Sequence, residues 1–123
     1  GAADPARPAF LRWLVFIAAA IYPTFVYGDV PSRWISDETA AAELRARTLE
    51  ARKAHWRQIE SQIAPAPWFL GKQFSALDIY VGAMTQWRPG RAWFQSECPK
   101  LHAIGLAVDG YSKLARVWAR NFG

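Results

Sequence analysis

Few residues in this sequence of 123 amino acids have a reactive side chain at a spacing typical of a catalytic or metal-binding site. Cys98 precedes Pro99, a residue favoured in the first turn of a helix, where a thiol ionises more readily and becomes more reactive. No base lies near it in the sequence, so we interpret Cys98 as structural. His55 and His102 each stand alone, without partners at metal-ligand spacing, and no metal site is predicted.

The segment Ser75-Ala76-Leu77-Asp78 has the pattern of a helix N-terminal capping box. In such a box the Ser75 hydroxyl accepts a hydrogen bond from the Asp78 amide, and the Asp78 carboxylate accepts one from the Ser75 amide. A carboxylate at this position could also act as a general acid or base. Because the capping box explains the position fully, we assign Ser75 and Asp78 a structural role.

The net charge of +5, from 15 Lys and Arg against 10 Asp and Glu, raises the question of a nucleic-acid partner. Five basic residues cluster near the middle of the chain: Arg45, Arg47, Arg52, Lys53 and Arg57. Three glutamates interleave with them at helix-neighbour spacing: Glu43, Glu50 and Glu60. This pattern indicates a solvated helix face, and we predict no nucleic-acid binding.

The apolar run from Trp13 to Tyr27 superficially resembles a signal peptide or a membrane span. It is shorter than the about 20 residues that cross a bilayer, it contains Pro23, and Asp29 follows it. We therefore predict a buried amphipathic helix and no membrane association. Since Cys98 is the single cysteine, no intramolecular disulfide can form, which favours a reducing compartment and a cytoplasmic location.

Hydrophobic periodicity and helix stop signals predict an all-α fold, an irregular helical bundle of about six helices in one domain. The expected helices run from Pro8 to Tyr22, from Ser36 or Asp37 to Ala64, from Ser75 to the Pro89-Gly90 pair, from Arg91 to Ser96, from Pro99 to Gly110, and from Ser112 to Phe122. Pro23 is expected to bend or break the first helix. The segment 28–32 is expected to be a loop.

Several stretches resemble the C-terminal helical domain of bacterial-type glutathione S-transferases. The stretches are Trp68 to Tyr80 (WFLGKQFSALDIY), Trp87-Arg88-Pro89, Cys98-Pro99-Lys100-Leu101, and Val117 to Phe122. The resemblance covers residues 1–123 and implies a parent protein with an additional N-terminal thioredoxin-like domain that binds glutathione, the co-substrate. It also implies a homodimer, and it implies that this domain alone binds no cofactor and has no catalytic residue.

In the resembled family this domain supplies a pocket for a small hydrophobic electrophile. By resemblance, the residues facing that pocket are Tyr22, Phe25, Tyr80, Trp87 and, with less support, Trp13. Ordinary core packing is the alternative for each of them, and it is the preferred interpretation for Phe25 and Tyr80. Some bacterial relatives carry a polar His-Lys pair where this sequence has Tyr22-Pro23, so a helper role for Tyr22 rests on its hydroxyl alone.

The sequence thus favours half of a glutathione S-transferase that conjugates or reduces small electrophiles, a half that is inactive by itself. Whether the parent protein is an enzyme is left open by the sequence. The alternative is a non-catalytic transferase-like scaffold or protein-interaction module, which would keep the helical core and lose the pocket.

Overall fold

The computed structural model describes residues 2–123, which are helical and contain no β-strand. If Arg7–Gly28 is counted as one helix, these residues form six helices, and the predicted all-α class is confirmed. The chain divides into two units, one ending at Ile59 and the other comprising Glu60–Gly123. Each unit is described by itself.

The first unit begins with a helix that is continuous through Pro23. It consists of α1 (Arg7–Phe16), a π-helical turn (Ile17–Ile21) and α2 (Tyr22–Gly28). Pro23 was expected to bend or break the helix; the helix does not break, and the irregularity before Pro23 is the π-turn. Proline lacks an N–H and crowds the carbonyl four residues back, and the wider π-turn just before it relieves that conflict, with the Tyr22 N–H bonding to the Ile17 carbonyl instead.

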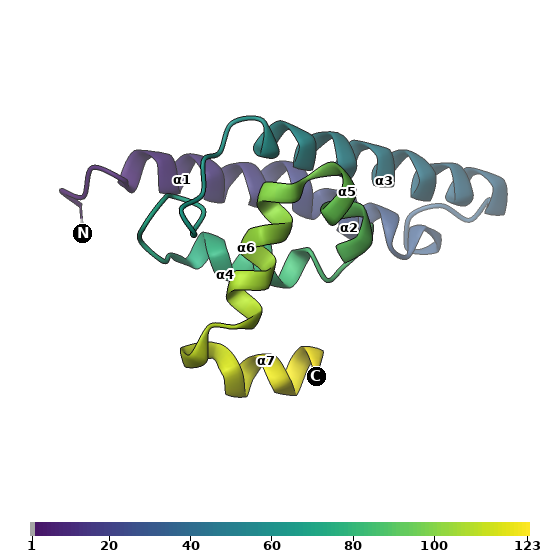
Figure 1. Cartoon of the computed structure of the whole chain (residues 1–123). Coiled ribbons are helices and arrows are strands. Elements are labelled where there is room, and N and C mark those ends of the chain that lie inside the picture. The colour runs from purple at the N-terminus through teal and green to yellow at the C-terminus, as the bar shows by residue number, and fades with distance from the viewer. Residues whose placement is uncertain (1) are drawn as a thin grey trace. The chain divides into compact units, whose positions relative to one another are not determined.

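Helix α3 (Glu38–Glu60) lies alongside the Arg7–Gly28 helix (Figure 1). Asp37 rather than Ser36 caps it, because the Asp37 Oδ2 accepts a hydrogen bond from the Ala40 N–H at 2.7 Å. The two helices approach closely at Gly28, where a Cβ would collide with the Thr48 hydroxyl. Between them, in the segment expected to be a loop, Pro31–Arg33 forms a short 3₁₀ turn.

Helix α3 ends at Glu60, four residues earlier than expected, and the Glu60 side chain caps a helix of the second unit. Its Oε1 and Oε2 accept hydrogen bonds from the backbone N–H groups of Lys100 (2.8 Å) and Leu101 (3.0 Å). The Lys100 ammonium in turn donates to the backbone carbonyls of Glu60 (3.2 Å) and Ile63 (3.0 Å). A carboxylate at a helix N-terminus and an ammonium at a helix C-terminus both suit the helix dipole.

The second unit contains α4 (Ala76–Met84), α5 (Arg91–Glu97), α6 (Pro99–Asp109), a 3₁₀ turn (Ser112–Leu114) and α7 (Ala115–Phe122). Helices α4 and α6 pack against each other through fully buried side chains: Leu77, Val81, Met84, Leu101, Ile104 and Val108. The Ser112 side chain forms no cap, and α7 begins after Leu114.

A close approach between α4 and α6 depends on Gly82, where a Cβ would lie 2.6 Å from Val108 Cγ1 and 3.1 Å from Trp118 Cζ2. Asp109, the last residue of α6, accepts a hydrogen bond from the Trp118 indole at 2.8 Å. Arg91 pairs with the same carboxylate through two nitrogens, at 2.9 and 3.1 Å. This arrangement attaches α7 and α5 to the end of α6.

Among the described residues, one helix is long and apolar enough to span a membrane, namely Arg7–Gly28, with a mean hydropathy of 1.8. It is longer than the sequence predicted, since it continues through Pro23. Four of its side chains are almost completely buried: Trp13, Ile17, Ile21 and Thr24. Core helices of soluble proteins meet the same criteria of length and composition, so this helix is weak evidence for a membrane span.

Candidate functional site

Three of the predicted pocket residues, Trp13, Tyr22 and Phe25, lie in the first unit. Trp13 is 6% exposed and packs edge-on against Phe16, with ring centroids 5.8 Å apart, which fits core packing. Tyr22 and Phe25 are half-buried and three residues apart on α2, so they are neighbours on the same side of that helix. Tyr22 directly follows the π-turn, a feature that is frequent at functional sites.

The structure reveals a buried arginine next to these aromatic residues, and sequence reasoning missed it. Arg52 of α3 is 2% exposed, so assigning it to a solvated helix face is wrong. Its Nε donates to the Thr24 hydroxyl and its Nη2 to the Thr24 carbonyl, each at 2.9 Å. Its guanidinium carbon lies 3.5 Å from the centroid of the Phe25 ring, in a cation–π contact.

A buried guanidinium is costly unless it is hydrogen-bonded and paired, and this one has both kinds of partner. Asp29 lies 3.5 Å from Nη2, and its side chain is 53% exposed, so the pair is open to solvent on the carboxylate side. A signal for this burial does exist in the sequence. Position 52 lies three residues after Leu49 and four before Trp56, so it shares one side of α3 with an apolar stripe that includes both of these residues.

Two other basic residues of the 45–57 cluster form ion pairs with the interleaved glutamates, as predicted. Arg47 pairs with Glu43 at 2.7 Å, with side chains 79% and 60% exposed. Lys53 pairs with Glu50 at 3.0 Å. An exposed pair such as Arg47–Glu43 contributes little to stability.

Tyr80 and Trp87, the remaining predicted pocket residues, lie in the second unit. Each is 37% exposed, whereas three apolar residues of α4 are completely buried: Leu77, Val81 and Met84. Trp87 was expected on the same helix as Tyr80, but α4 ends at Met84 and Trp87 lies in the turn that follows. Tyr80 is therefore more exposed than these neighbours, and its assignment to the core or to a pocket stays a prediction.

The capping box forms at the start of α4, and its carboxylate does more than cap. Asp78 accepts hydrogen bonds from the Ser75 N–H at 2.8 Å and from the Phe69 N–H at 2.7 Å. The Ser75 hydroxyl accepts from the amides of the first turn, including that of Leu77 at 3.2 Å. Burial raises the pKa of Asp78, while the N–H donors act in the opposite direction. Asp78 thus ties the 68–74 turn to α4.

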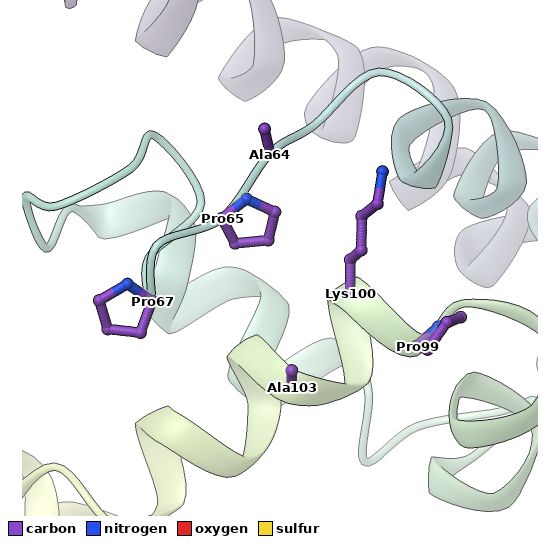
Figure 2. Close-up of a pocket in the computed structure, with 6 residues that line it drawn as sticks. All are labelled: Ala64, Pro65, Pro67, Pro99, Lys100 and Ala103. Carbon is purple, nitrogen blue, oxygen red and sulfur yellow. The ribbon is translucent and has the colours of Figure 1, made fainter.

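The second unit also has a surface groove of about 480 Å³ between the loop before Trp68 and the first turn of α6 (Figure 2). Its lining consists of Ala64, Pro65, Pro67, Pro99, Lys100 and Ala103. The Lys100 ammonium is engaged by two backbone carbonyls, and the other lining residues have no reactive side chain. The groove contains none of the predicted site residues.

Within residues 2–123, no group of three or more His, Cys, Asp or Glu side chains is placed to hold a metal ion. His55 contacts the Phe16 ring edge-on, with centroids 5.6 Å apart, as a packed side chain would. Cys98 is completely buried at the start of α6.

Comparison with known proteins agrees with this fold. The sequence matches the family described as glutathione S-transferase, C-terminal domain, over residues 42–117, and the chain belongs to that family. It is 37% identical over 115 residues to a protein of Escherichia coli (strain K12) described as the uncharacterized GST-like protein YncG. The match covers 94% of this chain but 55% of that protein, so the chain spans about half the length of this relative. No solved structure matches the chain.

Proposed function

We propose that this chain is the co-substrate-binding helical domain of a glutathione S-transferase, with residues 1–123 forming one such domain. Membership in the C-terminal domain family is the observation that carries the proposal. In the transferase reaction a hydrogen bond lowers the pKa of the glutathione thiol, and the thiolate attacks an apolar electrophile held beside it. This domain holds the electrophile and supplies no catalytic residue of its own.

Tyr22 and Phe25 in the first unit, together with Tyr80 and Trp87 in the second, are the proposed co-substrate contacts. The partial exposure of all four supports this role, because a pocket residue has to present part of its ring to a ligand. Trp13 is almost completely buried, so it presents little of its ring to a ligand. Aromatic rings suit small hydrophobic electrophiles because such pockets are predominantly apolar.

The rest of the proposed protein lies outside this chain. The relative is nearly twice as long as the matched region, which is consistent with an additional thioredoxin-like domain that binds glutathione. We place the protein in the cytoplasm as a homodimer that conjugates or reduces small electrophiles in detoxification. Without the glutathione-binding domain, this chain by itself is inactive.

The test is to express the full-length gene product and assay it with glutathione and 1-chloro-2,4-dinitrobenzene. In the expected reaction a sulfur–carbon bond forms, chloride leaves, and the thiol proton passes to solvent, so absorbance of the dinitrophenyl conjugate rises. A dimeric full-length protein that binds glutathione and forms the conjugate supports the proposal. A full-length protein that binds neither glutathione nor the conjugate refutes it and favours the non-catalytic scaffold.

A further inference from the structure

We propose that Arg52 is a positioning residue that fixes the aromatic co-substrate surface formed by Tyr22 and Phe25. This inference rests on the proposed function and adds a determinant of co-substrate affinity on a neighbouring helix. The observation behind it is a guanidinium, 2% exposed, that makes three separate contacts with two consecutive residues of α2.

The contacts hold the backbone on both sides of Tyr22. Arg52 donates to the carbonyl and to the hydroxyl of Thr24, two residues after Tyr22. The same Thr24 hydroxyl donates to the carbonyl of Ile21, immediately before Tyr22, at 2.6 Å. A single hydrogen-bonded chain therefore runs from α3 to the last residue of the π-turn, and Tyr22 lies between its two backbone attachment points.

The contact with Phe25 adds a constraint on the ring itself. A guanidinium 3.5 Å from the ring centroid covers one face of the phenyl group and restricts its rotation. The planar, forked guanidinium makes the two donations and the stacking contact together, which an ammonium cannot do. Arg52 thus fixes the main chain next to Tyr22 and the side chain of Phe25 at once.

Burial of this charge is expensive, and a hydrophobic residue would fill the same place on the apolar stripe of α3 at lower cost. The neighbouring stripe positions, Trp56 and Ile59, are indeed apolar and completely buried. The geometry at Arg52 is better explained by the need to hold α2 in one conformation next to its irregular turn than by stability alone.

The experiment uses the full-length protein with Arg52→Met, which keeps the length of the side chain but removes its charge and donors. Arg47→Met is the matched control, since Arg47 is on the same helix with its side chain 79% exposed. Isothermal titration calorimetry measures Kd for glutathione and for S-(2,4-dinitrophenyl)glutathione. We expect Arg52→Met to raise the Kd of the conjugate about tenfold while the Kd of glutathione changes by less than about twofold.

A second readout follows Tyr22 directly, without any ligand. In protein labelled with 3-fluorotyrosine, the Tyr22 fluorine resonance, assigned with Tyr22→Phe, should broaden or split in Arg52→Met and stay unchanged in Arg47→Met. Arg52→Lys should give intermediate values in both readouts. If Arg52→Met does not fold, Arg52→Lys and Thr24→Val, which removes one acceptor, carry the test.

The outcomes separate this inference from the function beneath it. An unchanged Tyr22 resonance, or equal weakening of glutathione and conjugate binding, overturns the positioning role. If the wild-type protein binds the conjugate no more tightly than glutathione, the proposed pocket is refuted. The fluorine resonance of Tyr22 then decides the positioning role by itself.

Discussion

Replacing Gly82 by alanine, at the crossing of α4 and α6, would have two opposite effects on stability, each of known size. An alanine in a helix interior is favoured over glycine by about 0.8–1.0 kcal/mol. Its methyl group would lie 2.6 Å from Val108 Cγ1, 2.9 Å from Val108 Cβ and 3.1 Å from Trp118 Cζ2. Overpacking of a core costs about 1–3 kcal/mol, and here the clash should win because Val108 is completely buried.

The β-branched side chain of Val108 has one strongly preferred rotamer in a helix, so it cannot turn away from the added methyl. We therefore expect Gly82→Ala to lower the free energy of unfolding by up to about 2 kcal/mol, the clash less the gain in helix propensity. Urea denaturation followed by far-ultraviolet circular dichroism measures this change.

A double-mutant cycle identifies the cause. In a Val108→Ala background the contact with Cγ1 at 2.6 Å is gone, while those with the Cβ of residue 108 and with Trp118 Cζ2 remain. Gly82→Ala should therefore cost less than in the wild type, with a coupling energy of about 0.5–3 kcal/mol. If Gly82→Ala instead stabilises the wild-type background by about 1 kcal/mol, the helix propensity outweighs the clash and the close crossing described for these helices is wrong.

Glu60→Gln should lower the free energy of unfolding by about 0.5–2 kcal/mol, because a neutral amide replaces the carboxylate that caps α6, while the exposed Glu50→Gln should stay within about 0.5 kcal/mol in the same urea titration. Burial raises the folded-state pKa of Asp78 above its ordinary value of 3.8, so the stability linked to its titration is present below that value and lost as pH rises through the folded pKa. The wild type should therefore gain stability relative to Asp78→Asn between about pH 7 and about pH 4, and urea midpoints that move the other way would contradict the shift. In the full-length protein, Tyr22→Ala should raise KM for 1-chloro-2,4-dinitrobenzene about tenfold and leave KM for glutathione within about twofold; equal effects on both would count against a pocket at Tyr22.

Features encoded by local rules could be predicted from the sequence, and the start of α4 is the clearest case. A serine three residues before an aspartate is sufficient for a capping box, because both partners belong to one turn of chain. The additional bond from the Phe69 N–H to Asp78 joins residues nine positions apart, and no local rule indicates it.

The structure departs from the expectations from sequence at Pro23 and Arg52, where another part of the structure compensates for the residue. Pro23 obeys the rule that proline disturbs a helix, but the disturbance is absorbed upstream by the π-turn, whose run of small and apolar residues has no recognised sequence signature. Charged residues usually avoid the core, but Arg52 is buried because Thr24 of α2 offers it two hydrogen-bond acceptors. The compensation for Pro23 lies in the same helix, and the compensation for Arg52 becomes visible only once α2 and α3 are placed side by side.

The π-turn at Ile17–Ile21 has a consequence for how this helix tolerates changes in length. A π-turn is geometrically equivalent to one residue inserted into an α-helix, and each residue advances an α-helix by about 100° around its axis. Deleting a single alanine from the turn would restore a regular helix and leave everything after it in the same phase. If the same residues instead formed a regular α-helix, everything after the turn would be rotated by about that angle, and Thr24 would turn away from Arg52 while Gly28 would no longer lie against Thr48. The π-turn therefore sets the phase of α2, and with it the direction in which Tyr22 and Phe25 face.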